Sequence, residues 1–156
     1  MRRSNPSTDP EDDPERGSAA LEFLVVGMLL LVPLVYLIVT LGLIQGGALG
    51  VEAGARHVAR AVATAVDADE ARDRADLVVA SVVREYGLDG SRTTVETRCR
   101  PAGATCPRAG ATLVVTLRTT VALPLVPPVL GLDRLASIPV ESTTVHKVSR
   151  VWGSGS

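Results

Sequence analysis

The sequence predicts an α+β protein in which a long N-terminal helix packs against a small antiparallel sheet of about three strands. Three observations lead to this prediction. Residues 24–44 form an uncharged apolar stretch, residues 51–86 carry apolar side chains at helical spacing, and apolar and polar residues alternate after residue 90. We therefore divide the chain into a leader, a membrane helix, a helical stalk, a β region and a flexible tail, over residues 1–17, 18–45, 46–90, 91–152 and 153–156.

The composition limits the classes of function that the chain could have. Of its 156 residues, 46% are hydrophobic but only 3% are aromatic, which suits slender or lipid-facing helices better than a large aromatic core. A net charge of −1 and scattered aromatic side chains provide no basic stripe for nucleic acid. The sequence contains no P-loop, nucleophile elbow, dinucleotide fingerprint or HExxH motif. We therefore expect no nucleic-acid binding, no enzymatic activity, no cofactor and no metal.

The apolar stretch is long enough to cross a membrane. Its 21 residues would span about 31 Å as a helix, which matches a hydrocarbon core of about 30 Å. A proline at position 33 is tolerated in such a helix because neighbouring groups satisfy the backbone that it frees. Two other interpretations remain open: a secretory signal peptide cut after the small residues 48–50, and an ordinary uncleaved anchor.

The segment before the stretch is charged and contains prolines. Residues 1–17 hold three arginines and five acidic residues without apolar periodicity, so we expect them to be disordered in the cytoplasm. Glu22 then places a single carboxylate at the beginning of the apolar stretch. An ionised side chain near bilayer depth costs about 2.5–3.5 kcal/mol, and less near a helix end, so this carboxylate needs an explanation.

The residues around Glu22 resemble the processing site of type IV prepilins. In "RGSAALEF" a basic residue, Arg16, and Gly17 precede a helix whose fifth residue is Glu22. Phe23 completes a Glu-Phe pair similar to that of the tight-adherence (Flp) pilus branch. The hydrophobic helix followed by a small β region most resembles the TadE/TadF minor pseudopilins, because the major Flp pilins are shorter and nearly all helix. The resemblance implies a pilin-like fold and a function in assembling an adhesive pilus or a secretion pseudopilus.

The same resemblance implies partners and a location. A prepilin peptidase would cut after Gly17 on the cytoplasmic side, which would make Ser18 the first residue and its amine a site of methylation. The chain would cross the cytoplasmic membrane once, with its N-terminus inside and its β region outside. Its helix would pack among those of other pilin subunits, and the pilus assembly machinery would incorporate it into a surface pilus.

An ion pair offers a physical role for Glu22. If the amine of Ser18 in a neighbouring subunit lay about 4 Å away at an effective dielectric constant of about 20, the pair would recover about 4 kcal/mol. Glu22 would then penalise misaligned helices and set the register of assembly. Alternatively, Glu22 extends to the lipid headgroups, and the chain is an uncleaved single-pass anchor for an extracytoplasmic ligand-binding module.

The helical stalk is expected to continue from the membrane to about residue 86, with a joint near Asp67. Glycines at positions 46, 47 and 50 are expected to loosen the helix at the outer membrane face. Asp67 and Glu70 have the spacing of a capping box, and Gly87 occupies the usual position after a helix end.

The β region contains three candidate strands. Period-two alternation over residues 92–99 and 111–123 predicts half-buried antiparallel strands. The residues expected to share a face are Thr93, Val95, Thr97 and Cys99 in the first strand, and Leu113, Val115, Leu117, Val121 and Leu123 in the second. Residues 138–152 alternate poorly, which favours an edge strand or a bulge. The proline-broken loop 124–135 would either cover the open end of the sheet or contact a membrane or a partner.

Cys99 and Cys106 enclose six residues between the first two strands. Outside the cytoplasm this spacing permits a disulfide, which would add about 2.5 kcal/mol in the chain-entropy model. A zinc site is disfavoured, because zinc prefers closer cysteines and because His57 and His146 are distant in sequence. We favour the disulfide and expect both histidines to be solvated surface residues.

Overall fold

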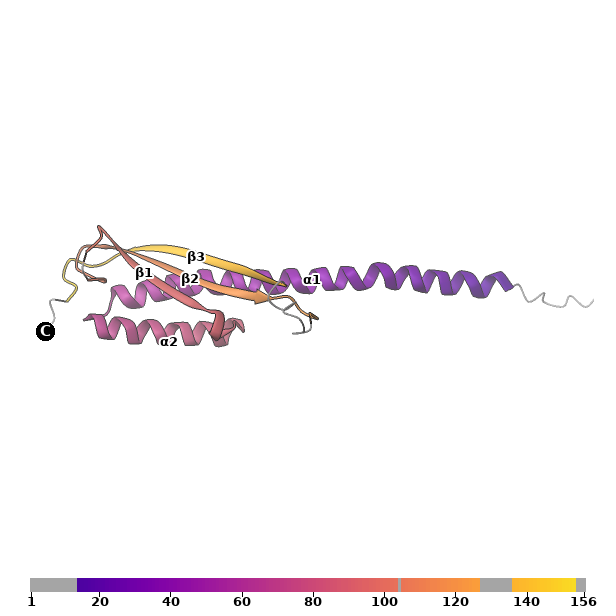
Figure 1. Ribbon diagram of the computed structural model, residues 1–156, viewed down its shortest axis with the longest axis horizontal. Helices are drawn as coiled ribbons and strands as arrows, with labels where there is room; N and C mark the ends of the chain where they lie inside the picture. The colour runs from indigo at the N-terminus through magenta and orange to yellow at the C-terminus, as the bar shows by residue number, and fades with distance from the viewer. Residues whose placement is uncertain (1–13, 104, 127–135, 154–156) are drawn as a thin grey trace, which may run out of the picture. The chain divides into compact units, whose positions relative to one another are not determined.

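A computed structural model describes residues 14–103, 105–126 and 136–153 (Figure 1). The elements are α1 (Pro14–Ala63), α2 (Ala68–Tyr86), η1 (Gly90–Arg92), β1 (Thr94–Arg100), β2 (Thr112–Ala122) and β3 (Ser137–Lys147). They confirm the predicted α+β class, with a long N-terminal helix and a three-stranded antiparallel sheet. The chain divides into two compact units, residues 1–38 and 39–156. Outside the described residues lie 1–13 of the predicted leader, 127–135 of the predicted loop and 154–156 of the predicted tail.

In the first unit, α1 exposes its apolar side chains on all sides. Every side chain from residue 19 to residue 35 is exposed, and Pro33 lies inside the helix without ending it. Among the residues that the structure describes, α1 is the one helix that is long and apolar enough to cross a membrane. The predicted membrane helix is therefore present as a helix of suitable length and composition.

α1 begins earlier than the sequence suggested. Residues 14–17 form its first turn, so the expectation that they are disordered together with the rest of the leader was wrong. Proline is favoured at the first helical position, since the N–H that it lacks would have no partner within the helix and its φ angle is already helical. Pro14 therefore gives α1 a defined beginning.

In the second unit, the predicted stalk consists of two helices and not of one continuous rod. α1 ends at Ala63, the chain turns over residues 64–67, and α2 runs back beside α1 (Figure 1). Gly50 lies against Tyr86 and Gly54 against Val82, so the two helices are antiparallel. The joint lies near Asp67 as expected, but the sequence did not reveal the reversal, because local signals mark where a helix ends and not where the chain goes next.

The ends of α2 follow local capping rules. The Asp67 carboxylate accepts hydrogen bonds from the backbone N–H groups of Asp69 and Glu70, at 3.0 and 2.8 Å, which confirms Asp67 as the N-cap. The Glu70 carboxylate accepts a bond of 2.7 Å from the N–H of Val66, one residue before the partner used in a capping box. Gly87 ends the helix in the left-handed conformation with φ of 63°, as predicted.

Gly47 and Gly50 are packing contacts of α1, as is Gly54, whereas Gly46 has open space around it; none of them loosens the helix, which corrects the predicted joint at residues 46–50. α1 continues unbroken through this region. A methyl group on Gly47 would lie 2.5 Å from Val121 of β2, and one on Gly54 would lie 2.5 Å from Leu117 of the same strand. These distances are far below van der Waals contact, so only glycine lets helix and sheet approach this closely.

The sheet has the order β1-β2-β3, with β2 antiparallel to both neighbours. Its inner face carries Leu113, Val115 and Leu117 of β2, which are fully buried as the alternation predicted. Leu123, which we assigned to the same face, lies beyond the end of β2. β3 is an edge strand as expected, and its continuous register with β2 over residues 137–147 excludes the alternative of a bulge there.

Two clusters of small and medium side chains join α1 to the sheet. Their buried members are Val58, Ala59, Val62, Ala63, Ala65, Ala71, Leu113, Val115 and Val148 in the first, and Val51, Ala55 and Leu117 in the second. Trp152, near the end of the described chain, is partly buried and packs against the first cluster. The core of the second unit is therefore built mainly from Ala, Val and Leu, as the low aromatic content of the chain requires.

Candidate functional site

The segment that resembles a prepilin processing site lies at the N-terminal end of α1. Arg16, Gly17 and Ser18 have helical backbone. Glu22 and Phe23 follow on the same helix, and the side chains of both are exposed. All five predicted processing residues therefore belong to one continuous element.

Glu22 is an isolated carboxylate on an apolar surface. The side chains next to it, Leu21, Phe23 and Leu24, are large, apolar and exposed. Of the residues that the structure describes, none forms an ion pair or hydrogen bond with the Glu22 carboxylate. Because residues four apart lie on one face of a helix, a cation at the position of Ser18 would lie one turn away on the same face. Among the described residues, the Glu22 carboxylate is therefore surrounded by exposed apolar side chains and has no charged partner.

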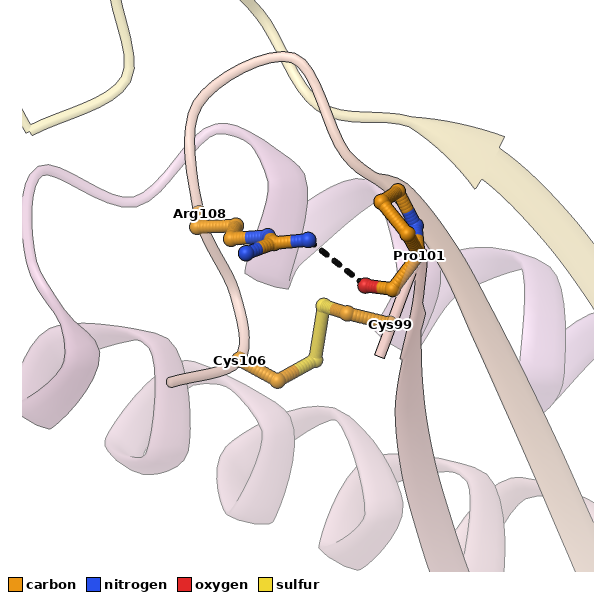
Figure 2. Close-up of a disulfide and its surroundings, with 4 residues drawn as sticks. All are labelled: Cys99, Pro101, Cys106 and Arg108. Carbon is orange, nitrogen blue, oxygen red and sulfur yellow. Dashed lines mark hydrogen bonds between the residues drawn. A yellow bond between two sulfur atoms is a disulfide. The ribbon is translucent and has the colours of Figure 1, made fainter. Parts of the chain in front are cut away.

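Cys99 and Cys106 form the predicted disulfide (Figure 2). Cys99 lies on β1 and Cys106 in the connection to β2, and their Cα atoms are 5.6 Å apart, which is in the usual range. The guanidinium of Arg108 donates a hydrogen bond of 2.6 Å to the carbonyl of Pro101 in the same connection. Two cross-links, one covalent and one polar, therefore hold the connection between β1 and β2.

The outer face of the sheet carries a row of ion pairs that the sequence analysis missed. Arg118 of β2 pairs with Glu141 of β3 at 2.7 Å and with Glu96 of β1 at 3.9 Å. Glu96 also pairs with Arg98 on its own strand. The hydrogen bond between Arg118 and Glu141 lowers the pKa of the Glu141 carboxyl and raises the pKa of the guanidinium. Alternating charges were visible in the sequence, but only the strand register shows which of them meet.

A hollow of about 490 Å³ lies beside the turn between α1 and α2. Asp67, Arg108 and Trp152 are among the residues that line it. The indole N–H of Trp152 is buried and has no hydrogen-bond partner among the described residues. A buried donor without a partner is costly to the fold.

The described residues contain no group of three or more His, Cys, Asp or Glu side chains placed to hold a metal ion. His57 on α1 and His146 on β3 are both exposed, as expected of solvated residues. The absence of enzymatic activity, of a cofactor and of nucleic-acid binding stays a prediction.

Compared with protein-family models, curated proteins and solved structures, the chain shows no significant match. What the protein does must therefore follow from its own residues. Three features bear on function: the exposed apolar helix, the spacing of Gly17 and Glu22 on it, and the disulfide-linked second unit.

Proposed function

We propose that this protein is a minor pilin or pseudopilin, similar to TadE/TadF, which acts in assembly of a tight-adherence (Flp-type) pilus or a related secretion pseudopilus. The observation that carries the proposal is the exposed Glu22 carboxylate, five residues after Gly17, at the beginning of an exposed apolar helix. An ordinary membrane anchor gains nothing from a charge at this position, since the charge makes insertion costlier. A helix that is cut after Gly17 gains an amine that can pair with it.

The proposed location is the cytoplasmic membrane, with the N-terminus inside and the second unit outside. The length and composition of α1 support a single span. The Cys99–Cys106 disulfide supports an extracytoplasmic second unit, because disulfides persist in oxidising compartments and are rare in the cytosol. In this arrangement a prepilin peptidase reaches Gly17 from the cytoplasmic side.

The proposed role of Glu22 is to set the register between neighbouring helices. Its carboxylate would pair with the amine of Ser18 in an adjacent subunit, and the pair would recover about 4 kcal/mol at a separation of about 4 Å and an effective dielectric constant of about 20. This gain exceeds the insertion cost of about 2.5–3.5 kcal/mol only when the two groups meet. A helix shifted along its neighbour would still incur the insertion cost of the Glu22 charge but would lose the energy of the ion pair.

Packing around Gly50 argues against the alternative of a signal peptide cut after residue 50. Such a cut would separate Gly47, which contacts β2, from the buried Val51 of the core. It would also place a charged amine on Val51, and burying a charge without a partner is costly. A cut after Gly17 leaves the whole second unit intact.

Intact-mass and N-terminal analysis of the membrane-extracted protein tests the processing step. With a prepilin peptidase co-expressed, we expect a chain that begins at Ser18, and without the peptidase a chain that begins at Met1. Gly17→Leu should abolish the cut, whereas Gly27→Leu should leave it unchanged, because Gly27 has open space around it. A chain that begins at Met1 in the presence of the peptidase, or one that begins at Val51, would contradict the proposal.

Glu22→Ala tests the register role. We expect the variant to be cut normally but to co-purify less with the other pilus subunits, because the pairing with the neighbouring amine is lost. Glu52→Ala is the matched control, since Glu52 is also an exposed carboxylate on α1 but already pairs with Arg56 of the same helix. If Glu22→Ala and Glu52→Ala co-purified equally with the other pilus subunits, Glu22 would have no role in setting the register.

The second candidate function is an uncleaved anchor that displays a ligand-binding module. The hollow that Trp152 lines favours this alternative. In that case Glu22→Ala would change neither localisation nor assembly, and Trp152→Phe would weaken ligand binding without affecting processing. The two candidate functions therefore predict opposite results for the same pair of variants.

A further inference from the structure

The turn that follows β2 exposes a leucine in an unusual backbone conformation. Leu125 is 89% exposed, the highest exposed fraction among the large apolar side chains that the structure describes. Its φ angle is 66°, in the left-handed region that leucine rarely adopts. The backbone of this turn therefore presents an apolar side chain outward, although a glycine or asparagine would adopt the same conformation more easily.

This turn lies at one particular end of the second unit. Ala122, the last residue of β2, lines a hollow of about 220 Å³ together with Leu43 of α1 and Tyr86 of α2. Gly47 of α1 contacts Val121 of the same strand end. The C-terminal end of β2 and the beginning of β3 both lie away from the connection between α1 and α2 (Figure 1). Leu125 follows three residues after Ala122 at this end.

The same end of the second unit is where the apolar stretch of α1 finishes. The stretch covers residues 24–44, so Leu43 is its second-last residue. If this stretch crosses a bilayer, Leu43 lies at the boundary between hydrocarbon and headgroups. The residues that share a hollow with Leu43 then lie at the depth of the headgroups. Tyr86 is one of them, and tyrosine is enriched at this depth because one end of its ring is apolar and the other polar.

We propose that the turn at residues 123–126 is a second membrane contact, in which Leu125 inserts into the outer edge of the bilayer beside the span. The occupant of this surface is lipid, because the end of the span brings lipid to this level of the molecule. The four residues Leu123, Pro124, Leu125 and Val126 carry no charge, so none opposes insertion. The inference rests on the proposed membrane span but not on processing or pilus assembly.

Other exposed apolar side chains of the second unit provide a matched comparison. Leu77 on α2 is 71% exposed and lies nine residues before Tyr86, away from the hollow that contains Leu43. It has the same side chain as Leu125 but no position near the end of the span. Lipid contact at Leu125 but not at Leu77 would therefore show that position near the end of the span decides the contact. Lipid contact at both leucines would show only that exposed apolar side chains bind lipid nonspecifically.

Tryptophan quenching in vesicles tests the inference on the full-length chain. Trp152→Phe removes the native fluorophore, and Leu125→Trp or Leu77→Trp then places a single probe at each position. The chains are reconstituted in phosphatidylcholine–phosphatidylglycerol vesicles that contain lipids brominated near the headgroup. We expect the tryptophan at position 125 to lose much of its emission and the tryptophan at position 77 to keep it. Tryptophan suits the turn as well as leucine does, because neither side chain is branched at Cβ.

A second arm needs no tryptophan in the turn. The otherwise unaltered chain in nanodiscs is illuminated with a phospholipid that carries a photoactivatable diazirine near the headgroup, and we expect a cross-link in the peptide that contains Leu125. Leu125→Asn should lose the cross-link without a change in folding, because asparagine tolerates the left-handed conformation. Leu77→Asn should leave the cross-link in place.

The outcomes separate this inference from the proposals on which it depends. Equal quenching at positions 125 and 77, or a cross-link that survives Leu125→Asn, would overturn the lipid contact and leave the membrane span intact. A chain that carbonate extracts from the vesicles would overturn both the contact and the span. Neither the quenching nor the cross-linking experiment depends on pilus assembly. A failure of the proposed function in pilus assembly would therefore appear only in the experiments on processing and incorporation.

Discussion

Two stretches of α1 use apolar side chains in opposite ways. From residue 19 to residue 35 the side chains are exposed on every side of the helix. From residue 47 to residue 63 one face is buried against β2 and α2, and the opposite face carries exposed polar and charged residues such as Glu52 and Arg56. The difference shows that one helix can serve two environments. The side chains of the first stretch are exposed in the described structure, whereas the second stretch packs against the sheet and α2.

Side-chain size separates the two stretches as clearly as exposure does. The first stretch is rich in Leu and Val, whose large surfaces contact lipid well but would keep a sheet at a distance. The buried face of the second consists of Gly, Ala and Val, which let β2 approach the helix axis. Small side chains along one face therefore mark the part of α1 that packs against β2 and α2.

The largest expected effect comes from truncating two leucines, Leu113 of β2, which packs in the core with the second stretch, and Leu29 of the first stretch. Leu113 is 0% exposed, so Leu113→Ala should lower the free energy of unfolding of the second unit by about 2–5 kcal/mol through the cavity that it leaves. Leu29 is 72% exposed, so Leu29→Ala should leave that free energy unchanged. Chemical denaturation in detergent micelles, followed by Trp152 fluorescence, measures both. Equal effects would contradict the burial of Leu113 in the core that the second stretch shares with β2, or the exposure of Leu29 in the first stretch.

A smaller effect, with opposite signs, is expected for two glycines of α1. Gly54→Ala should lower the free energy of unfolding by about 1–3 kcal/mol, because the new methyl group would meet Leu117 and Val82. Gly46→Ala should raise it by up to about 1 kcal/mol, since alanine is the better helix former and Gly46 has open space around it. The same denaturation assay tests both variants. A gain in stability for Gly54→Ala would disprove the close approach of α1 and β2.

The smallest expected effect is a pH dependence from the outer face of the sheet. Arg118 lowers the pKa of the Glu141 carboxyl in the folded protein, so the unfolded chain takes up a proton first as the pH falls. The stability from this pair is therefore fully present above the unfolded pKa, which is about 4.3, and is lost as the pH falls through the lower folded pKa. Glu141→Gln should flatten the fall in melting temperature over this acidic range, and added salt should reduce the difference.

Glu85→Gln is the control for this pH effect, because Glu85 is an exposed carboxylate on α2 and does not belong to the sheet. Its melting temperature should follow the wild-type curve. An identical flattening in both variants would assign the effect to total charge and not to the pair of Arg118 and Glu141.

Features that depend on neighbouring residues could be predicted from the sequence. The N-cap at Asp67 and the helix end at Gly87 require only local hydrogen bonds and a local backbone conformation. The alternation around Leu113 predicted the buried face of β2, because side chains alternate along any strand. The disulfide was predictable since its cysteines are seven positions apart and both belong to one strand connection.

Features that depend on contacts distant in sequence could not be predicted in the same way. The roles of Gly47 and Gly54 depend on residues of β2 more than sixty positions later, so the sequence indicated only a weak point in the helix. The ion pairs of Arg118 require the register of both neighbouring strands. Of the candidate site, the sequence supplied the spacing of Gly17 and Glu22, and the structure added the exposure of the Glu22 side chain.

The simple order of the sheet affects how the second unit can fold. Each strand pairs with the strand that precedes or follows it in the chain, across connections of 11 residues (101–111) and 14 residues (123–136). The entropy of closing a loop rises only slowly with length, so connections of 11 and 14 residues cost only modestly more to close than tight turns do. The three strands can therefore associate in the order in which they are synthesised, before any later part of the chain is needed.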